Sequence, residues 1–465
     1  MDDSGVLEGV GSDALEEMPE LEYGLASPPG GFLRWPNISF PSEVWDNVLE
    51  AAIGSFEDDL FGQADRRAAF MEVDITWASR ITSNPAMWSD IYVNNTTHSS
   101  MAEFYTCIVN SKSRKLRICL EVEDNIRWRQ ASDLPPRLIS DFLEEVRPLI
   151  SIAMNRTSSL KLCCVGLGAL DLVLSMLSMV PDSDSRELQQ LQIESYPPQH
   201  GVELRHNFNS GFFRQQPLSI YRCSWVFLPC PLASVTVLHF QHFIVDLGLT
   251  WKQLKNALES AAALQVLHLL CVECVADADS DYRMEDHPCT LHHLTKLDII
   301  IAHPSAERIA RALRLPMLRT LQCKATQGWW KQSLLDSMAF LGTVDAAVVC
   351  GVEDLYDVVQ NLPQVQRLDV RSPARMQLLQ RFDCAKVMQQ PNCCSFLTDI
   401  FLAERLSLLE ITSFLHRAAL SLPRNLTLTV PWERTNEAGF IPYRFREIEG
   451  TVVCNAVSTV DLFYV

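Results

Sequence analysis

Three stretches of the sequence set its fold: LQVLHL at residues 264–269, LHHLTKLDI at residues 291–299 and LPMLRTL at residues 315–321. In each, leucines three residues apart lead into a short alternation of apolar and other side chains. Such alternation is typical of a β-strand with one buried face. The matching leucines Leu238, Leu267, Leu297 and Leu321 are 29, 30 and 24 residues apart, which predicts one repeated unit rather than unrelated strands.

The pattern continues toward both ends of the chain. Further instances begin at Leu188, Leu232 and Leu362, and shorter strands are expected at residues 116–120, 160–162, 397–402 and 426–428. Because these spacings match the lengths of leucine-rich repeats, they predict an array of roughly ten units.

Two gaps in the array are wider than one repeat. The distances from Leu191 to Leu238 and from Leu321 to Leu368 are both 47 residues, so each gap has room for one degenerate unit. The candidate strands of these units are residues 218–220 and residues 347–349.

Between the strands the apolar spacing changes from two to about 3.6, which indicates helices. The residues that mark them are Trp251, Leu254, Leu258 and Ala262, then Ala306, Ile309, Ala310 and Leu313, then Leu355, Val358 and Leu362. Neither element can bury its apolar face alone, whereas stacked neighbours bury both. The predicted fold is therefore α/β: an irregular leucine-rich-repeat solenoid over residues 94–430, with a curved parallel sheet and helices on its convex side.

The two ends of the chain differ from the array. Residues 1–22 carry eight carboxylates and no lysine or arginine, which predicts a disordered acidic tail and linker over residues 1–35. Residues 431–465 are expected to form a C-terminal cap or tail.

A short helical module is predicted over residues 36–93. Proline is suited to a first helical turn, and the residues after Pro41 place apolar side chains on more than half of a helix, so that helix must bury two sides. A second helical pattern follows, marked by Phe70, Val73, Trp77 and Ile81, and it ends where Asn84-Pro85 blocks continuation.

The combination of Phe-Pro-x-Glu-Val, a later Val-x-x-x-Trp and a closing Asn-Pro-x-Met-Trp resembles the F-box, specifically the F-box-like segment that precedes repeats in large fungal families. The resemblance implies docking to the Skp-type adaptor of a cullin-type (SCF-like) ubiquitin ligase. The residues that it assigns to the docking site are Phe40, Pro41, Val44, Trp45, Val48, Leu49 and Trp77. An alternative is that this segment is only an N-terminal helical cap of the repeats.

A possible metal motif lies inside the array. Cys271, Cys274, His287 and His292 have the spacing of a two-cysteine two-histidine zinc finger, but Ala278 stands where a finger needs an aromatic core residue. Because Cys271 also continues a predicted strand and His292 lies in the next repeat, no metal site and no cofactor are predicted.

Composition and motifs exclude several functions. A net charge of −18 without a basic stripe argues against nucleic acid as a partner. The apolar run from Leu162 to Val180 is interrupted by Asp171 and ended by Pro181, so no membrane span is expected, and the N-terminus lacks the features of a signal peptide. The fifteen cysteines are therefore expected to be reduced, in the cytoplasm or the nucleus. A doubly wound α/β enzyme is the alternative fold, but no phosphate-binding glycine loop or nucleophile elbow occurs, so no catalytic residues are predicted.

The predicted function is non-catalytic recruitment of a target protein to a ubiquitin ligase. The helical module would bind the Skp-type adaptor, and the repeats would bind the target. Trp329 and Trp330 are the first candidates for target binding, since tryptophan is enriched in interface hot spots. The loop from Tyr196 to Pro217 is the next candidate. The alternative is a leucine-rich-repeat interaction scaffold with no ligase role.

Overall fold

The structure is a computed structural model that describes residues 41–53, 60–95, 100–123, 138–180, 187–196, 217–228, 230–243, 249–274, 286–301, 303–325, 341–350, 355–371, 396–402, 427–432 and 453–458. Residues 1–47 and 48–465 form two separate compact units. The β-sheet and the helices that cover it belong to the second unit.

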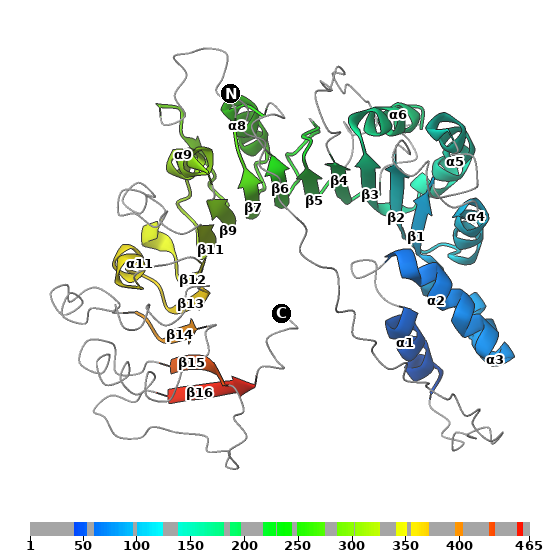
Figure 1. Cartoon of the computed structure of the whole chain (residues 1–465), viewed down its shortest axis with the longest axis horizontal. Coiled ribbons are helices and arrows are strands. Elements are labelled where there is room, and N and C mark those ends of the chain that lie inside the picture. Colours follow the sequence, from blue (N-terminus) through cyan, green and yellow to red (C-terminus); the bar gives the residue numbers. More distant parts are fainter. Residues whose placement is uncertain are drawn as a thin grey trace, which may run out of the picture. The chain divides into compact units, whose positions relative to one another are not determined.

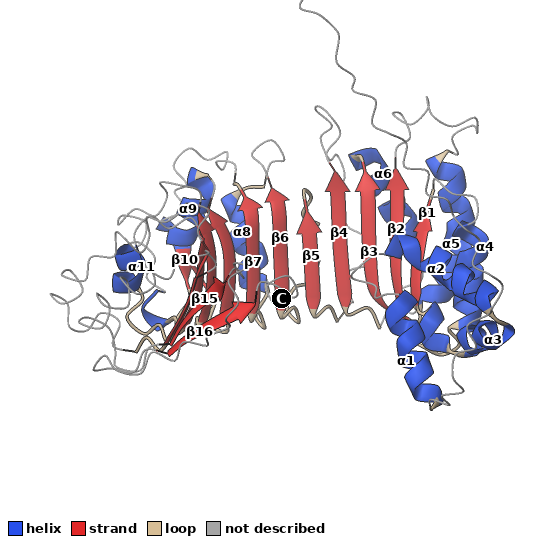
Figure 2. Ribbon diagram, turned by 60° about the horizontal axis from the view of Figure 1, so that its bottom comes forward, coloured by secondary structure: helices blue, strands red, loops and turns tan. Residues whose placement is uncertain are grey.

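The described strands form one long parallel sheet in which neighbours follow the order of the chain (Figure 1 and Figure 2). It has 14 strands: β1 Asp90–Asn94, β2 Leu116–Glu123, β3 Thr157–Val165, β4 Gln190–Tyr196, β5 Ile220–Ser224, β6 Val237–Phe243, β7 Val266–Val272, β9 Lys296–Ile301, β11 Thr320–Ala325, β12 Ala346–Cys350, β13 Arg367–Arg371, β14 Asp399–Leu402, β15 Thr427–Trp432 and β16 Val453–Ser458. A second sheet pairs β8 Cys289–Thr290 with β10 Leu313–Arg314. Sequential parallel strands, each followed by its own connection, are the arrangement of a leucine-rich-repeat array.

The repeat leucines occupy equivalent places in this sheet. Leu238 pairs with Leu267, and Leu267 pairs with Leu297, and all three side chains are buried. Both degenerate strands are present, as β5 and β12. The prediction of a long parallel α/β repeat array is therefore confirmed.

A hydroxyl residue precedes several strands and joins each to the repeat before it. Ser219, Thr236, Thr295 and Thr398 each donate a side-chain hydrogen bond of 3.1 Å to a backbone carbonyl of the preceding repeat. These bonds occupy carbonyl oxygens at the edge where one repeat ends and the next begins, so they hold neighbouring strands in register.

Helices cover one face of the sheet (Figure 1). They are α4 Ser100–Asn110, α5 Ile139–Met154, α6 Leu167–Ser178, α8 Trp251–Ser260, α9 Pro304–Ala312 and α11 Leu355–Asn361, with a short 3-10 turn, η6, at Leu341–Thr343. The predicted helix at Trp251 begins with a capping box between Thr250 and Gln253 and buries Trp251, Leu254 and Leu258, but it ends before Ala262. Leu313, expected at the end of α9, instead begins β10.

The helices that precede the sheet are α1 Ser42–Ile53, α2 Leu60–Val73, α3 Ile75–Ser83 and a 3-10 turn, η1, at Pro85–Trp88. The prediction of one helix through Phe70, Val73, Trp77 and Ile81 is wrong, because the helix is interrupted between α2 and α3. Asp74 causes the break: its backbone is extended and its carboxylate accepts from the backbone N–H of Thr76 at 2.7 Å, as an N-cap does.

The sheet extends further than the predicted array. β1 lies within the segment predicted as the helical module, and β16 lies within the predicted C-terminal cap or tail. The run from Leu162 to Val180 is divided between β3 and α6. None of the described helices has the length and apolar content that crossing a membrane requires.

Candidate functional site

Helix α1 carries an exposed apolar row beside a buried one. Val44 and Val48, one turn apart, are 39% and 49% exposed, whereas Leu49 and Ile53 are 1% and 3% exposed. Residues four apart lie on the same side of a helix, so Val44 and Val48 form a small apolar strip open to solvent.

The other residues predicted to dock an adaptor are placed differently. Pro41 is exposed and its carbonyl accepts the first hydrogen bond of α1, from Val44 at 3.0 Å. Trp45 is half-buried, and Trp77 is half-buried with its ring 5.6 Å from that of Phe70. The buried Leu49 belongs to the core. Phe40 lies outside the described residues.

Arg67, in α2, connects this helix to η1 and to α4, the first helix of the repeat array. It is 4% exposed, donates to the carbonyl of Met87 at 3.0 Å and to the carboxylate of Glu103, and lies 5.2 Å from the ring of Trp88. Since Glu103 is in α4, this one side chain connects α2, η1 and α4. The helix α2 and the turn η1 are therefore packed against α4, the first helix of the repeat array.

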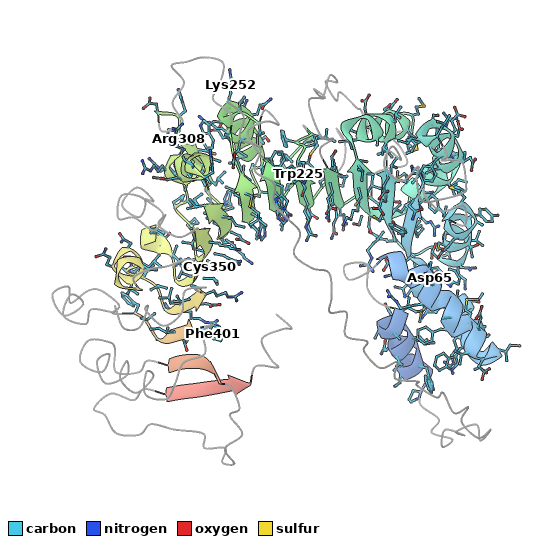
Figure 3. All side chains as sticks on the ribbon, viewed as in Figure 1. Asp65, Trp225, Lys252, Arg308, Cys350 and Phe401 are labelled. Carbon is cyan, nitrogen blue, oxygen red and sulfur yellow. The ribbon has the colours of Figure 1, made fainter. Side chains whose placement is uncertain are left out.

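We call the face of the sheet opposite the described helices the open face. It carries most of the polar side chains of the strands. On each strand, residues that alternate with the buried leucines lie there, and strand pairing arranges them in rows. The middle row consists of Tyr92, Cys119, Lys161, Gln192, Arg222, His239, His268, Asp298, Gln322, Val348, Asp369 and Phe401. Figure 3 labels Trp225, Cys350 and Phe401 on the sheet, and Lys252 and Arg308 on helices.

Over β1 to β4 the polar side chains of this face are paired with one another. Tyr92 donates to the carboxylate of Glu121, and Lys161 lies 3.3 Å from the carboxylate of Glu194. The Cys163 thiol is 3.5 Å from the same carboxylate of Glu194. Burial, together with the hydrogen bond to Glu121, raises the pKa of Tyr92 above its usual range. This part of the open face is a closed polar network.

Over β6 to β9 the middle row holds two neighbouring histidines with tilted rings. The rings of His239 and His268 are 4.9 Å apart, and Nδ1 of His268 is 3.1 Å from the carboxylate of Asp298. Nε2 of His239 is buried and has no hydrogen-bond partner among the described residues. Burial, followed by the nearby His268 and Arg222, lowers the pKa of His239 to about 4.

This shift predicts a pH-dependent stability. The pKa of His239 is about 4 in the folded protein and 6.5 in the unfolded chain. Between these two pH values the unfolded chain binds a proton at His239 that the folded protein does not bind. The free energy of unfolding therefore falls as the pH falls from about 6.5 to 4. Allowing for solvent screening, the loss from this residue is expected to be on the order of 1–2 kcal/mol.

Equilibrium unfolding from pH 4 to pH 7 on wild type and His239→Asn checks it. The difference between the two curves should change across the window, and a variant at the exposed His292 controls for the removal of a histidine as such. A difference that is constant with pH would contradict the assignment.

Near the carboxyl ends of the three consecutive strands β5, β6 and β7, one residue each has a left-handed backbone. Trp225, His242 and Cys271 have φ values of 68°, 56° and 55°. L-residues seldom adopt this conformation, which costs roughly 1–2 kcal/mol each. The rings of Trp225 and His242 stack at 5.3 Å, so this turn places an aromatic pair at the edge of the open face.

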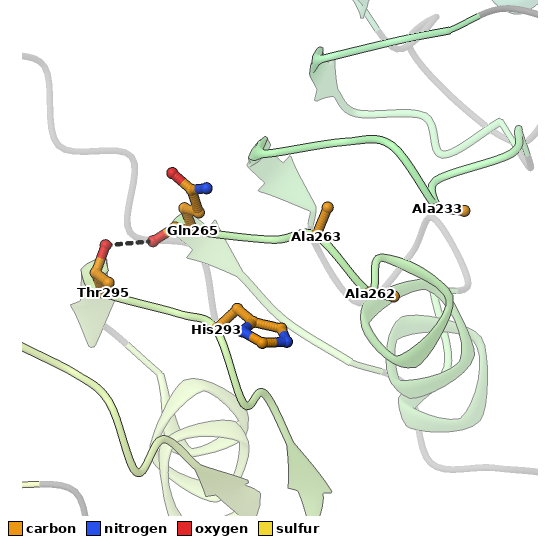
Figure 4. A pocket seen from close by; sticks show the side chains of 6 residues that line it. All are labelled: Ala233, Ala262, Ala263, Gln265, His293 and Thr295. Carbon is orange, nitrogen blue, oxygen red and sulfur yellow. Dashed lines mark hydrogen bonds between the residues drawn. The ribbon is translucent and has the colours of Figure 1, made fainter.

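A shallow depression lies at the turns that precede β6, β7 and β9 (Figure 4). Its walls are Ala233, Ala262, Ala263, Gln265, His293 and Thr295, and the hydroxyl of Thr295 donates to the carbonyl of Gln265. These walls include no carboxylate, and their one hydroxyl, that of Thr295, donates to the Gln265 carbonyl rather than to His293. The depression has no arrangement for catalysis.

Four of the described thiols are not activated as nucleophiles. Burial raises the pKa of Cys107, Cys164, Cys230 and Cys289 to about 12, which keeps these thiols protonated at neutral pH. Within the described ranges no three His, Cys, Asp or Glu side chains gather as metal ligands.

The residues with zinc-finger spacing belong to different elements. Cys271 is in β7, Cys274 is buried just after it, and His287 and His292 are exposed. Residues 275–285 between them lie outside the described part of the chain. So do Trp329 and Trp330, together with residues 197–216 of the loop from Tyr196 to Pro217, so target binding there stays a prediction.

Sequence reasoning did not single out the rows of the open face, although a signal for them exists. His239, His268 and Asp298 are the middle residues of Leu238-x-Phe240, Leu267-x-Leu269 and Leu297-x-Ile299. Aligning the repeats and extracting only these middle positions would have brought the three together.

No protein-family model and no curated protein matches this sequence. Among solved structures, the leucine-rich-repeat-containing protein LegL7 from Legionella pneumophila is similar, with a TM-score of 0.35 and 10% identity over 76% of this chain and 93% of that chain. A likeness this low adds nothing to the fold, which rests on the strand order and register described above.

Proposed function

We propose that this protein is a non-catalytic adaptor that recruits a target protein to a cullin-type ubiquitin ligase. The helices α1 to α3 would bind the Skp-type subunit, and the repeat array would hold the target. The observation that carries the proposal is the exposed strip of Val44 and Val48 on a helix whose other side is buried, in the segment that resembles an F-box. Exposed apolar side chains in such a strip are typical of a protein interface.

A scaffold without a ligase role is the second candidate. The packing of Arg67 favours it, because that residue bonds the helices to the array as a terminal cap would be bonded. The parallel repeat sheet, with its long open face, is suited to protein binding under either candidate.

Binding of the purified full chain to a purified Skp-type subunit tests the ligase role. The full chain is needed because β1 pairs with β2, and Arg67 contacts α4, beyond the end of the helical segment. Val48→Asp is expected to weaken this binding by about 30-fold or more, since losing an anchor at the centre of an interface commonly costs about 2 kcal/mol.

Val109→Asp is the matched control. Val109 is also an exposed helical valine, at 53%, but it lies on α4, away from the proposed strip. It should leave adaptor binding unchanged. Absence of measurable binding by the folded wild-type chain, or equal losses in the two variants, would leave the scaffold as the function.

A further inference from the structure

The open face over β5 to β13 is locally basic in a strongly acidic chain. Its rows hold five cationic side chains, Arg222, Lys296, Lys324, Arg367 and Arg371, and two carboxylates, Asp298 and Asp369. The chain as a whole has a formal charge of −18. With its pKa lowered to about 4, His239 adds no charge at pH 7.

The carboxylates on this face are already engaged. Asp298 pairs with His268 at 3.1 Å and Asp369 with Arg371 at 2.9 Å. In the next strand, Asp399 lies opposite Arg367 and accepts from the hydroxyl of Thr398. Among the described residues, none of these carboxylates lies within ion-pair distance of Arg222, Lys296, Lys324 or Arg367.

Four cations remain without an acidic partner among the described residues: Arg222, Lys296, Lys324 and Arg367. Three of them are exposed, and Lys296 is half-buried. In a chain with 57 acidic and 39 basic residues, four unpaired cations on one face are a local excess that a partner of opposite charge would neutralise.

The four cations are spread along the sheet. Arg222 in β5 and Arg367 in β13 are six strand steps apart, with Lys296 and Lys324 on the adjacent strands β9 and β11 between them. At about 4.8 Å per step the span is roughly 29 Å, which an extended polypeptide of about nine residues would cover.

Apolar side chains lie between these cations. Val237 and Val266 precede Lys296 in its row, and Ile300 precedes Lys324 in its row, all of them half-buried. A nucleic acid backbone would make phosphate contacts with these cations but would gain little from the aliphatic side chains between them. An acidic polypeptide can use both the charges and the apolar contacts.

From this placement we propose that the open face between β5 and β13 binds an extended, carboxylate-rich segment of the target protein. The segment crosses the strands, and its aspartate and glutamate side chains pair with Arg222, Lys296, Lys324 and Arg367. This inference rests on the proposed function in one respect, that the array captures a protein target, and it does not depend on the ligase contact.

Fluorescence anisotropy on the full chain tests it, with labelled (Glu-Ser)6 as the probe. The peptides (Gln-Ser)6 and (Lys-Ser)6 and the oligonucleotide dT12 are the comparison probes. (Glu-Ser)6 is expected to bind at least tenfold more tightly than the others, and less tightly as NaCl rises, because salt screens exposed charges. Lys324→Gln and Arg367→Gln should each weaken it about two- to fivefold, the fold-change of an exposed ion pair.

Lys252→Gln and Arg308→Gln are the matched controls. They remove the same charge from exposed positions on α8 and α9, on the helix-covered side of the sheet (Figure 3). They should leave binding unchanged. Equal losses in these controls, equal binding of (Gln-Ser)6, or tighter binding of dT12 would overturn the proposal.

One further variant distinguishes the chain's own acidic N-terminal segment as occupant. If (Glu-Ser)6 binds only after the eight carboxylates of residues 1–22 are changed to Asn or Gln, that segment competes for the face and the external partner is excluded.

Adaptor binding measured on the same variants separates this test from the proposed function. Lys324→Gln should not alter it, and a chain that binds the acidic peptide but not the adaptor would lose only the ligase role.

Discussion

Replacing Trp251 with alanine is expected to lower the free energy of unfolding by about 3–5 kcal/mol, the largest stability loss predicted for this chain. Trp251 is the first residue of α8, is fully buried, and is the largest completely buried side chain in the part of the chain that the structure describes. Removing its indole leaves a cavity between the helix and the sheet, which neighbouring side chains can close only partly.

Because each repeat contacts mainly its neighbours, the damage should begin locally. Hydrogen exchange is expected to accelerate first in β6 and β7, before the rest of the sheet, while chemical denaturation reports the total loss.

Trp251→Phe is the informative companion variant. The indole N–H of Trp251 is buried without a hydrogen-bond partner among the described residues, a condition that itself costs about 1–3 kcal/mol. Phenylalanine removes that N–H and keeps most of the apolar contact, so it should destabilise far less than alanine. Equal losses in the two variants would mean that the indole does not fill the site as described.

The second large effect is expected at Arg67, where methionine should cost about 3 kcal/mol. The variant keeps most of the buried volume but removes the charged hydrogen bonds to Met87 and Glu103 and the contact with the Trp88 ring. The Met87 carbonyl then loses the hydrogen bond from Arg67, and the Glu103 carboxylate loses its ion pair.

Thermal and denaturant unfolding of Arg67→Met, Glu103→Gln and the double variant measure the pair as a double-mutant cycle. The double variant should be less destabilised than the sum of the single variants. Arg114→Met, at an exposed arginine in the turn after α4, is the control and should stay within about 0.5 kcal/mol of wild type. Additive losses would show that the two residues do not act together.

The order and the type of the repeated elements could be predicted from the residue pattern alone. Leucines recurring at 24 to 30 residues place one strand per unit, and both wide gaps proved to hold the strand that their length requires, β5 and β12. The spacing around Trp251 likewise predicted α8. These features follow from local periodicity, which depends only on which side chains can be buried along one element.

Short elements and helix ends were harder to predict from the sequence. β1 has only five residues, and its two clearly apolar positions, Ile91 and Val93, are too few to establish an alternation. The break at Asp74 depends on one side-chain hydrogen bond to Thr76, which competes with a helical pattern that otherwise continues through it.

Which side chains meet could not be predicted, because that depends on how the repeats pair and pack. His239, His268 and Asp298 come from units about 30 residues apart, and they form one row because the hydrogen bonds between strands set the register. Arg67 reaches Glu103 because α2 packs against α4, and the unpaired cations of the open face can be recognised only after every nearby carboxylate has been assigned a partner. Periodicity states which face of an element is buried, whereas register and packing between elements decide what lies opposite each residue on the other face.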